Sequence, residues 1–209
     1  MIVLRPDQKT LEASFAHNPL FPLVELFSIH GIKHLEIAWS PNPVWPSLMK
    51  ELQRRFPTIL WGAASVTSKK ALDIVSKLGL PYAMSPIWDH AVQVEAIQLD
   101  QLLIPGVTSV SDIKAAQNLG YRLIKIFPAS SLGIEYLKQL SSQISSLPFV
   151  IAAGGLRISD INQWLNAGYG AIAVGRELFI EKQLDPDCLA WLGKNASQSQ
   201  SPGDILGTK

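Results

Sequence analysis

Lys125 is the residue of this sequence whose surroundings most strongly suggest chemistry. It lies in the middle of residues 123–128, an apolar run that otherwise has the composition of a buried strand. Burying an ammonium group is costly, because the loss of water destabilises its charged form. The same loss of water favours the neutral amine, which attacks carbonyl carbon and forms a Schiff base. The alternative interpretation is a lysine on an edge strand that extends its ammonium group into water.

A second ionisable residue, Glu36, lies in another apolar run of similar length. Side chains alternate between the two faces of a strand. Lys125 and Phe127 therefore share one face of their strand. On the other strand Glu36 points to one face, and Leu35 and Ile37 point to the opposite face. If both ionisable groups face the same interior, they lie near one another, and the carboxylate can move protons during imine chemistry. A buried structural ion pair is the alternative.

The elements that must position these residues follow a repeated rhythm of strand and helix. Eight short β-rich runs alternate with amphipathic stretches that carry helix signals, so the strands are expected to be parallel and to close into a (β/α)₈ TIM barrel. A doubly wound open sheet is the alternative, but no Gly-x-Gly-x-x-Gly turn follows the first run. The predicted strands are residues 2–5, 34–38, 58–62, 82–85, 102–104, 122–126, 149–152 and 171–174.

The length of 209 residues and the 47% content of hydrophobic residues suit one domain with a sizeable core. We expect a single barrel domain over residues 1–194 and a polar, mobile tail over residues 195–209, which are rich in Ser, Gln and Gly. The long first crossover contains Pro19 and Pro22, so it is expected to form two helices rather than one.

Composition also argues against several classes of function. A formal net charge of +1 gives no sign of nucleic-acid or anionic-membrane binding, and no apolar stretch approaches the ~20 residues of a membrane span. The single cysteine, Cys188, excludes an internal disulfide and suits a reducing compartment. With no signal segment apparent, we expect a cytoplasmic protein. The four histidines have no ligand spacing, so no metal site is expected. No cofactor is expected either.

In such a barrel the functional groups lie at the carboxyl ends of the strands. Gly154-Gly155 and Gly175-Arg176 follow the last two predicted strands. Barrels commonly hold a phosphate there on backbone N–H groups, so these residues are candidates for binding an anion. Any tight turn also favours glycine, and only the position of the pair at the strand end makes it informative.

Several short motifs also occur in the order found in a known family. They are Leu35-Glu36-Ile37, Gly62-Ala63-Ala64-Ser65-Val66, Ala83-Met84-Ser85-Pro86, Ile104-Pro105-Gly106-Val107-Thr108, Lys125-Ile126-Phe127-Pro128-Ala129 and Gly154-Gly155. At these residues the chain resembles the 2-keto-3-deoxy-6-phosphogluconate / 4-hydroxy-2-oxoglutarate (KDPG/KHG) aldolases. The resemblance implies a class I, metal-independent aldolase, usually a homotrimer, that cleaves a 2-keto-4-hydroxy acid to pyruvate plus an aldehyde.

The resemblance also implies roles for individual residues of this chain. Lys125 would form the Schiff base, and Glu36 would be the general acid and base. Ser65 stands where the family usually has Thr and would place a hydroxyl near the pyruvate part of the substrate. Pro86 and Phe127 would line the pocket.

The chain departs from the family pattern where the substrate is selected. Many members carry an Arg four residues after the catalytic Glu to hold the pyruvate carboxylate, and here that position is Ser40. Arg5, at the end of the first strand, is the candidate for this task, because a guanidinium group suits a bidentate contact. Ala153 replaces the usual Thr before the glycine pair. Arg176 replaces a phosphate-contacting Ser, so it could bind a phosphate or a second carboxylate, or fill the pocket.

Three functional hypotheses follow. The favoured one is an active, pyruvate-forming aldolase acting on a keto acid. The second is a phosphate-binding barrel enzyme of another class, an isomerase or synthase, in which Lys125 serves only as a charge. The third is a catalytically idle relative that binds a keto acid or a partner, suggested by Ser40, Ala153 and Arg176.

Overall fold

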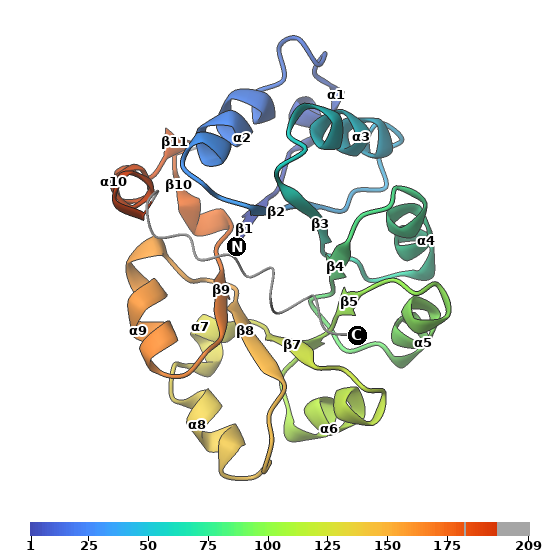
Figure 1. Ribbon diagram of the computed structural model, residues 1–209, viewed down its shortest axis with the longest axis vertical. Coiled ribbons are helices and arrows are strands. Elements are labelled where there is room, and N and C mark those ends of the chain that lie inside the picture. Colours follow the sequence, from blue (N-terminus) through green and yellow to red (C-terminus); the bar gives the residue numbers. More distant parts are fainter. Residues whose placement is uncertain (182, 196–209) are drawn as a thin grey trace.

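The computed structural model describes residues 1–181 and 183–195, which form a ring of parallel strands surrounded by helices (Figure 1). The predicted tail lies, from residue 196 onward, outside the described residues. The strands of the ring are β1 (Ile2–Leu4), β2 (His34–Ala38), β3 (Leu60–Ala64), β4 (Tyr82–Met84), β5 (Leu103–Ile104), β6 (Gly106–Val107), β7 (Leu123–Ile126), β8 (Phe149–Ala153) and β9 (Ala171–Ala173).

Two sheets, β1-β2-β3-β4-β5 and β6-β7-β8-β9, join to close the barrel. Pro105 separates β5 from β6, because proline has no N–H to donate to the ladder, but its carbonyl still accepts from the Lys125 N–H at 2.8 Å. The ring closes where the Val3 N–H donates to the Val174 carbonyl at 2.8 Å. With β5 and β6 as one interrupted strand, this is the predicted (β/α)₈ barrel.

The third strand differs from its prediction. We expected residues 58–62, whereas β3 runs over Leu60–Ala64. Its register with β2 pairs Glu36 with Gly62 and Ala38 with Ala64, and this pairing with the neighbouring strand decides where β3 begins and ends. The small residues at its end are therefore part of the barrel wall.

Helices cover the outside of the ring, and several begin at side chains that cap them. Ser68 accepts a hydrogen bond from the Ala71 N–H at 3.2 Å, and Ser109 forms a capping box with Asp112. The long first crossover forms two helices, as predicted. The helices are α1 (Gln8–Glu12), α2 (Leu20–Ile29), α3 (Trp45–Arg55), α4 (Lys69–Lys77), α5 (His90–Gln98), α6 (Val110–Asn118), α7 (Ala129–Leu132), α8 (Tyr136–Ser141), α9 (Ile161–Asn166) and α10 (Pro186–Asn195).

Short elements follow the last strands of the ring. The 3₁₀ turn η1 (Ile158–Asp160) precedes α9, and η2 (Arg176–Leu178) follows β9. An antiparallel pair of two-residue strands, β10 (Phe179–Ile180) and β11 (Gln183–Leu184), then leads into α10. The turn η2 is important for the site, because it begins at one of the predicted binding residues.

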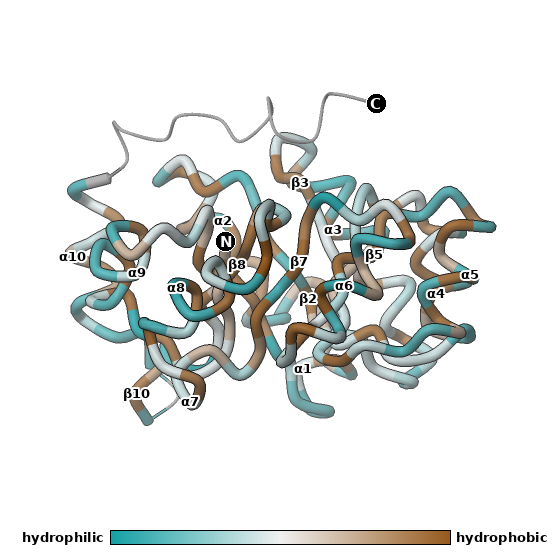
Figure 2. Tube along the Cα trace, turned by 90° about the horizontal axis from the view of Figure 1, so that it is seen from below, coloured by the Kyte–Doolittle hydropathy of each residue, from teal (hydrophilic) through white to brown (hydrophobic). Residues whose placement is uncertain are grey.

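The buried side chains form two apolar clusters. They are separate because successive side chains along each strand point to opposite faces of the sheet. One cluster fills the barrel and includes Val3, Met84 and Ile151, with Phe127 packed against it. The other lies between the barrel and the helices and includes Ile124. In Figure 2 the strands inside the molecule are mostly brown, and teal segments are frequent on the outer loops. The predicted inward and outward faces of the Lys125 strand are therefore confirmed.

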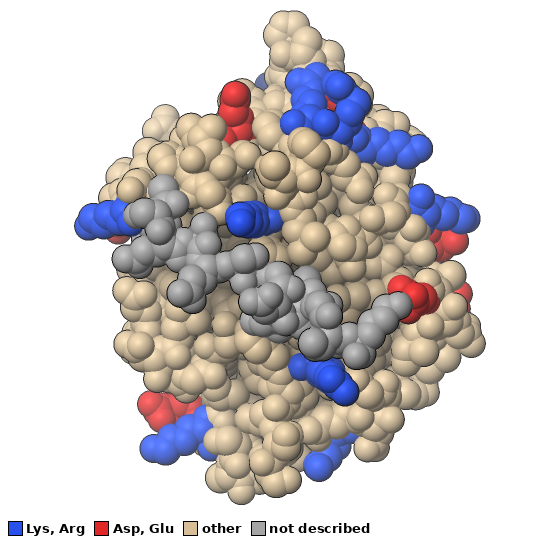
Figure 3. Space-filling model, viewed as in Figure 1, with Lys and Arg blue, Asp and Glu red and all other residues tan. Residues whose placement is uncertain are grey.

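Charged side chains are spread over the surface. On the face drawn in Figure 3, Lys and Arg lie in separate groups, several of them next to acidic side chains. The ion pairs of the described residues include Arg54 with Glu51 and Lys77 with Asp73. Over residues 1–181 and 183–195, no helix combines the length and apolar character needed to cross a bilayer. Within the same residues no group of three or more His, Cys, Asp or Glu side chains could hold a metal ion.

Candidate active site

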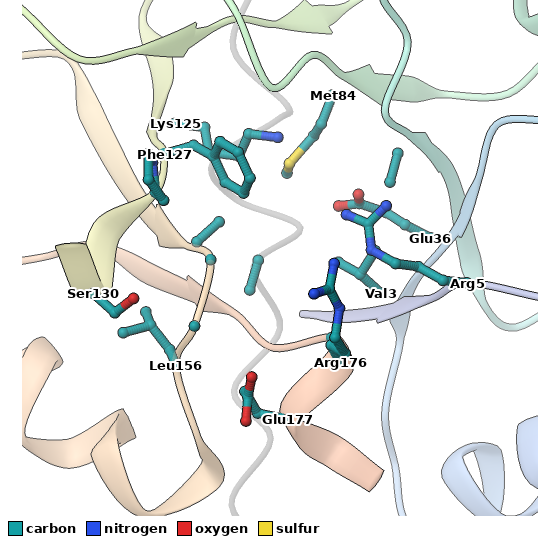
Figure 4. Close-up of a pocket in the computed structure, with 17 residues that line it drawn as sticks. Val3, Arg5, Glu36, Met84, Lys125, Phe127, Ser130, Leu156, Arg176 and Glu177 are labelled. Carbon is teal, nitrogen blue, oxygen red and sulfur yellow. The ribbon is translucent and has the colours of Figure 1, made fainter. Parts of the chain in front are cut away.

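A cavity of about 240 Å³ lies where the strands of the barrel end, and both ionisable residues identified from the sequence line it (Figure 4). Lys125 reaches it from β7 and Glu36 from β2. The picture shows Lys125 pointing across the cavity toward the side that carries Glu36 and Arg5. The interior placement of the two residues, predicted from the alternation along their strands, is thus confirmed.

Lys125 is buried, with 6% of its surface exposed. Among the described residues it has no hydrogen bond or ion pair through its amine, and its Nζ atom lies 5.5 Å from the centroid of the Phe127 ring. Desolvation lowers the pKa of Lys125 to about 8, while the charge of Glu36 acts to raise it and that of Arg5 to lower it. This environment keeps a useful fraction of the amine neutral near neutral pH.

Glu36 is buried more deeply, with 1% of its surface exposed. Its Oε1 atom has no hydrogen-bond partner among the described residues. Desolvation raises the pKa of Glu36 to about 7, although the charges of Lys125, the Met1 amino group and Arg5 act to lower it. A carboxyl group in this state can both accept and return a proton near neutral pH.

The lysine and the glutamate therefore form a coupled pair whose pKa values are displaced toward each other. A neutral amine can attack a carbonyl carbon, and the carboxyl group can transfer the protons that accompany this attack. Catalytic groups commonly show pKa values perturbed in this way. The arrangement is suited to Schiff-base chemistry on a small carbonyl compound.

Two arginines add positive charge to the wall of the cavity. Arg5, just beyond β1, donates from Nη1 to Ser65 Oγ at 2.9 Å. Arg176 begins η2 directly after Gly175, and it also lines the cavity. Desolvation of the guanidinium group and the charge of Arg176 lower the pKa of Arg5, while Glu36 acts in the opposite direction. Figure 4 shows both arginines on the same side of the cavity, where they can bind one anion or neighbouring anionic groups.

The same two arginines line a second cavity of about 770 Å³. This cavity extends between the segment after β1, the start of α2 and the β10–β11 pair, and much of its wall is apolar, with Leu20, Leu23 and Phe179 among its residues. Arg5 and Arg176 thus contribute to the walls of both cavities.

The glycine pair after β8 has the backbone shape that the sequence suggested. Gly154 and Gly155 have φ angles of 96° and 71°, in the left-handed region that favours glycine. A Cβ atom at Gly154 would lie 2.8 Å from Phe127 Cε2, and one at Gly155 would overlap Ser130 Oγ. Both glycines line the cavity, and their lack of side chains leaves room for Phe127 and Ser130.

Most of the predicted substrate-binding residues lie in the wall of the cavity, and two do not. Ser65 lies outside the lining, although its hydrogen bond with Arg5 keeps it next to the site. Pro86 also lies outside it, because its backbone packs closely against Gly106 of the adjacent strand. The predicted binding residues that do line the cavity are Arg5, Phe127, Gly154, Gly155, Gly175 and Arg176.

The structure adds wall residues that the sequence reasoning did not select. Met84 faces the cavity from β4, and Ala64 does so from β3. The alternation along their strands could have identified both. At β4 the predicted binding residue was Pro86, which follows the strand, and β3 was predicted two positions too early. Glu177, next to Arg176, brings a carboxylate to the same wall. No pattern in the sequence distinguished it.

Comparison with known proteins gives a consistent result. The family model described as "KDPG and KHG aldolase" matches residues 13–191. The chain is similar to 2-dehydro-3-deoxy-6-phosphogalactonate aldolase of Escherichia coli (strain K12), with 28% identity over 120 residues, which are 57% of this chain and 58% of that protein. It is also similar to 2-dehydro-3-deoxy-phosphogluconate aldolase of Haemophilus influenzae, with 24% identity over 168 residues, which are 80% and 78% of the two chains.

Solved structures share the fold. A structure described as native KDPGal superimposes with a TM-score of 0.75 at 22% identity and covers 94% of this chain and 95% of its own. A KDPG aldolase from Legionella pneumophila, solved with pyruvate captured as a covalent carbinolamine intermediate, gives a TM-score of 0.75 at 22% identity. The match covers 96% of this chain and 94% of the Legionella chain. At this identity the likeness establishes the barrel fold.

Proposed function

The chain belongs to the KDPG and KHG aldolase family, and we propose that it is a class I aldolase that cleaves a 2-keto-4-hydroxy acid to pyruvate plus an aldehyde. The observation that carries this proposal is the pairing of Lys125 and Glu36, buried on one cavity with pKa values shifted in opposite directions. Lys125 is the proposed nucleophile and Glu36 the proposed acid and base.

The first half of the reaction uses the neutral amine. Lys125 Nζ attacks the C2 carbonyl carbon of the keto acid, and the carbonyl oxygen takes up a proton, which gives a carbinolamine. Loss of water then gives a protonated Schiff base. A pKa of about 8 leaves about one Lys125 amine in ten neutral at pH 7, against roughly one in three thousand for an ordinary lysine. Most of the neutral, nucleophilic Lys125 amine at pH 7 is therefore due to desolvation.

The second half uses the carboxylate. Glu36 accepts the proton of the C4 hydroxyl, the C3–C4 bond breaks, and its electron pair moves toward the iminium nitrogen as the aldehyde leaves. The remaining enamine takes the proton back at C3 from the Glu36 carboxyl group. Water then hydrolyses the new imine, which releases pyruvate and restores the Lys125 amine.

Substrate selection is assigned to the cationic wall. Arg5, held by Ser65, binds the carboxylate next to the keto group, and Phe127 limits the space around it. Arg176 binds a second anionic group, a phosphate or a carboxylate, on the aldehyde part of the substrate. The backbone N–H groups of the segments that contain the Gly154-Gly155 and Gly175-Arg176 pairs complete this second anion site.

The proposed trimer and metabolic role rest on the resemblance to the family, and the single domain and the cytoplasmic location rest on the composition of the sequence. We propose a homotrimer of a single barrel domain formed by residues 1–194, located in the cytoplasm and acting in carbohydrate metabolism. Size-exclusion chromatography with light scattering tests the assembly, since a mass three times that of the chain is expected. A mass equal to one chain contradicts the trimer.

A direct assay tests the proposed reaction. Purified protein is incubated with KDPG and, separately, with 4-hydroxy-2-oxoglutarate, and released pyruvate is measured with a coupled dehydrogenase. We expect pyruvate from at least one of the two compounds and a loss of about 10³-fold or more in Lys125→Ala. The matched control is Lys77→Ala, which removes an exposed lysine on α4 that pairs with Asp73.

The other functional hypotheses predict different results. A phosphate-binding enzyme of another class releases no pyruvate and forms no covalent adduct through Lys125, which serves it only as a charge. An idle relative binds the keto acid without turnover. Either result, obtained with folded protein and an active control aldolase, contradicts the proposed function.

A further inference from the structure

Tyr82 is a large polar residue inside the barrel to which the proposed reaction gives no task. Only 1% of its surface is exposed, and it belongs to the cluster that fills the barrel interior. Its phenol ring lies directly over Gly62 of the neighbouring strand. A Cβ atom at Gly62 would overlap the end of the Tyr82 ring and would lie 2.9 Å from the Tyr82 hydroxyl oxygen. Because Gly62 has no side chain, the phenol ring of Tyr82 has room to extend across β3.

Glu36 lies on β2, the strand on the other side of β3 from Tyr82. The strand register pairs Gly62 with Tyr82 on one side and with Glu36 on the other, so the three residues occupy one layer of the barrel. Neighbouring strands lie about 4.8 Å apart, so a hydroxyl above Gly62 is about one strand spacing from the Glu36 backbone. Both side chains point into the barrel, so the phenol hydroxyl and the Glu36 carboxyl group lie in the same layer of its interior.

Two buried polar atoms of this layer have no hydrogen-bond partner among the described residues. One is Tyr82 Oη and the other is Glu36 Oε1. Buried polar groups are nearly always hydrogen-bonded, since an unsatisfied group is costly to remove from water. The two atoms are complementary, because a phenol hydroxyl donates and a carboxylate oxygen accepts.

We propose that Tyr82 is a positioning residue for Glu36, and that its hydroxyl donates to the Glu36 carboxylate through one bridging water molecule. This inference rests on the proposed function of Glu36 as the acid and base. The hydroxyl favours the ionised carboxylate and fixes the direction in which it faces the cavity. The negative charge of Glu36 in turn raises the pKa of Tyr82, together with desolvation as the larger cause, which keeps the phenol a donor.

Other charged and titratable groups also act on this carboxylate. Lys125 faces it from β7, and Arg5 and the Met1 amino group act from the two ends of β1. His34 precedes Glu36 by two residues on β2 and shares its inward face. Tyr82 differs from Lys125, Arg5 and the Met1 amino group because it carries no charge at neutral pH. Its removal alters one hydrogen bond without changing the net charge of the site.

The test is a double-mutant cycle that does not depend on activity. The free energy of unfolding is measured by denaturant titration for the unsubstituted protein, Tyr82→Phe, Glu36→Gln and the double variant, at about pH 5.5 and about pH 8.5. Phenylalanine keeps the ring over Gly62 and removes only the hydroxyl. We expect Tyr82→Phe to raise the pKa of Glu36 by about one pH unit, because a hydrogen bond to the ionised form is lost.

The sign of the effect follows from this shift. A raised pKa of Glu36 in the folded state means that the free energy of unfolding falls as this carboxyl group ionises. The loss of unfolding free energy in Tyr82→Phe is therefore larger at about pH 8.5 than at about pH 5.5. The difference corresponds to about tenfold in the folding equilibrium constant. In the Glu36→Gln background this extra loss disappears. An equal loss at both pH values, unchanged by Glu36→Gln, would overturn the proposal.

Kinetics separate this inference from the proposed function. If the unsubstituted protein releases pyruvate, Tyr82→Phe is expected to move the acid limb of its kcat/KM profile upward by about one pH unit. The matched control is Tyr169→Phe, which removes the hydroxyl of a buried tyrosine in the cluster between barrel and helices. It is expected to leave the limb in place. If no pyruvate is released, the unfolding cycle still decides the contact between Tyr82 and Glu36.

Discussion

Lys125 of β7 and Glu36 of β2 line one cavity at the end of the barrel, and neither forms an ion pair among the described residues. Desolvation moves both pKa values toward neutrality, that of the lysine downward and that of the glutamate upward. Burial thus gives the pair both a neutral amine and a carboxyl group that exchanges protons near pH 7. The predictions below follow from this relationship and from the groups around it.

Replacing Glu36 with Gln removes the proton carrier and leaves the nucleophile. We expect kcat to fall about 10²- to 10⁴-fold, the usual range for loss of a general acid or base. Imine formation with pyruvate should persist at a reduced rate, because Lys125 still provides the amine. Steady-state kinetics and borohydride trapping measure the two effects separately. Unchanged kcat in the folded variant would remove Glu36 from the mechanism.

The rate of imine formation should depend on pH in the way the lowered pKa of Lys125 dictates. The amine becomes nucleophilic as it loses its proton, so the rate of trapping with pyruvate rises with pH and reaches half its limit at about pH 8. Rapid-quench trapping across a series of buffers gives this midpoint. A midpoint near the ordinary lysine value of about 10.4 would show that desolvation does not activate this residue.

Arg176 is expected to select the anionic group on the aldehyde part of the substrate. In Arg176→Ser, KM for a phosphorylated or carboxylated substrate should rise about tenfold or more, because a charge-assisted hydrogen bond is lost. Trapping with pyruvate alone should change little. Arg54→Ser, which removes an exposed arginine paired with Glu51, serves as the control. An unchanged KM together with slower trapping would assign Arg176 to the pyruvate end instead.

Gly155 is expected to tolerate no side chain. Gly155→Ala places a methyl group in a left-handed backbone region and against Ser130 Oγ. The matched control is Gly79→Ala, where φ is 63° and no atom lies within 4 Å of the added group. The control should lose about 1 kcal/mol of unfolding free energy through its backbone alone. Gly155→Ala should lose about 1–3 kcal/mol more, since the contact adds to the strain. Equal losses would contradict the close approach of Ser130.

Much of the fold and the central pair could be predicted because they depend on local pattern. The alternation on the strands of Lys125 and Glu36 needs no knowledge of the neighbouring strands, and it turned both residues inward. The limits of β3 were predicted two residues too early, because Gly62 and Ala64 look like turn residues until their pairing with β2 is known. Small residues there make room for the cavity and for the Tyr82 ring.

The rest of the site depends on contacts between distant segments. Pro86 follows β4 as the motif indicated, yet its packing against Gly106 removes it from the cavity wall. The position of Tyr82 relative to Glu36 depends on the register of three strands. No spacing along the sequence encodes this register, so the relative position of the two residues appears only in the assembled barrel.

The measurement that tests the central claim most directly is covalent trapping at Lys125. The protein is incubated with pyruvate and sodium borohydride, digested, and mapped by mass spectrometry, with Lys125→Ala as the comparison. We predict one stable reduced pyruvate adduct, located on Lys125 and absent from the variant. If the folded protein acquires no adduct, or carries it on other lysines while Lys125 stays unmodified, the Schiff-base account is contradicted.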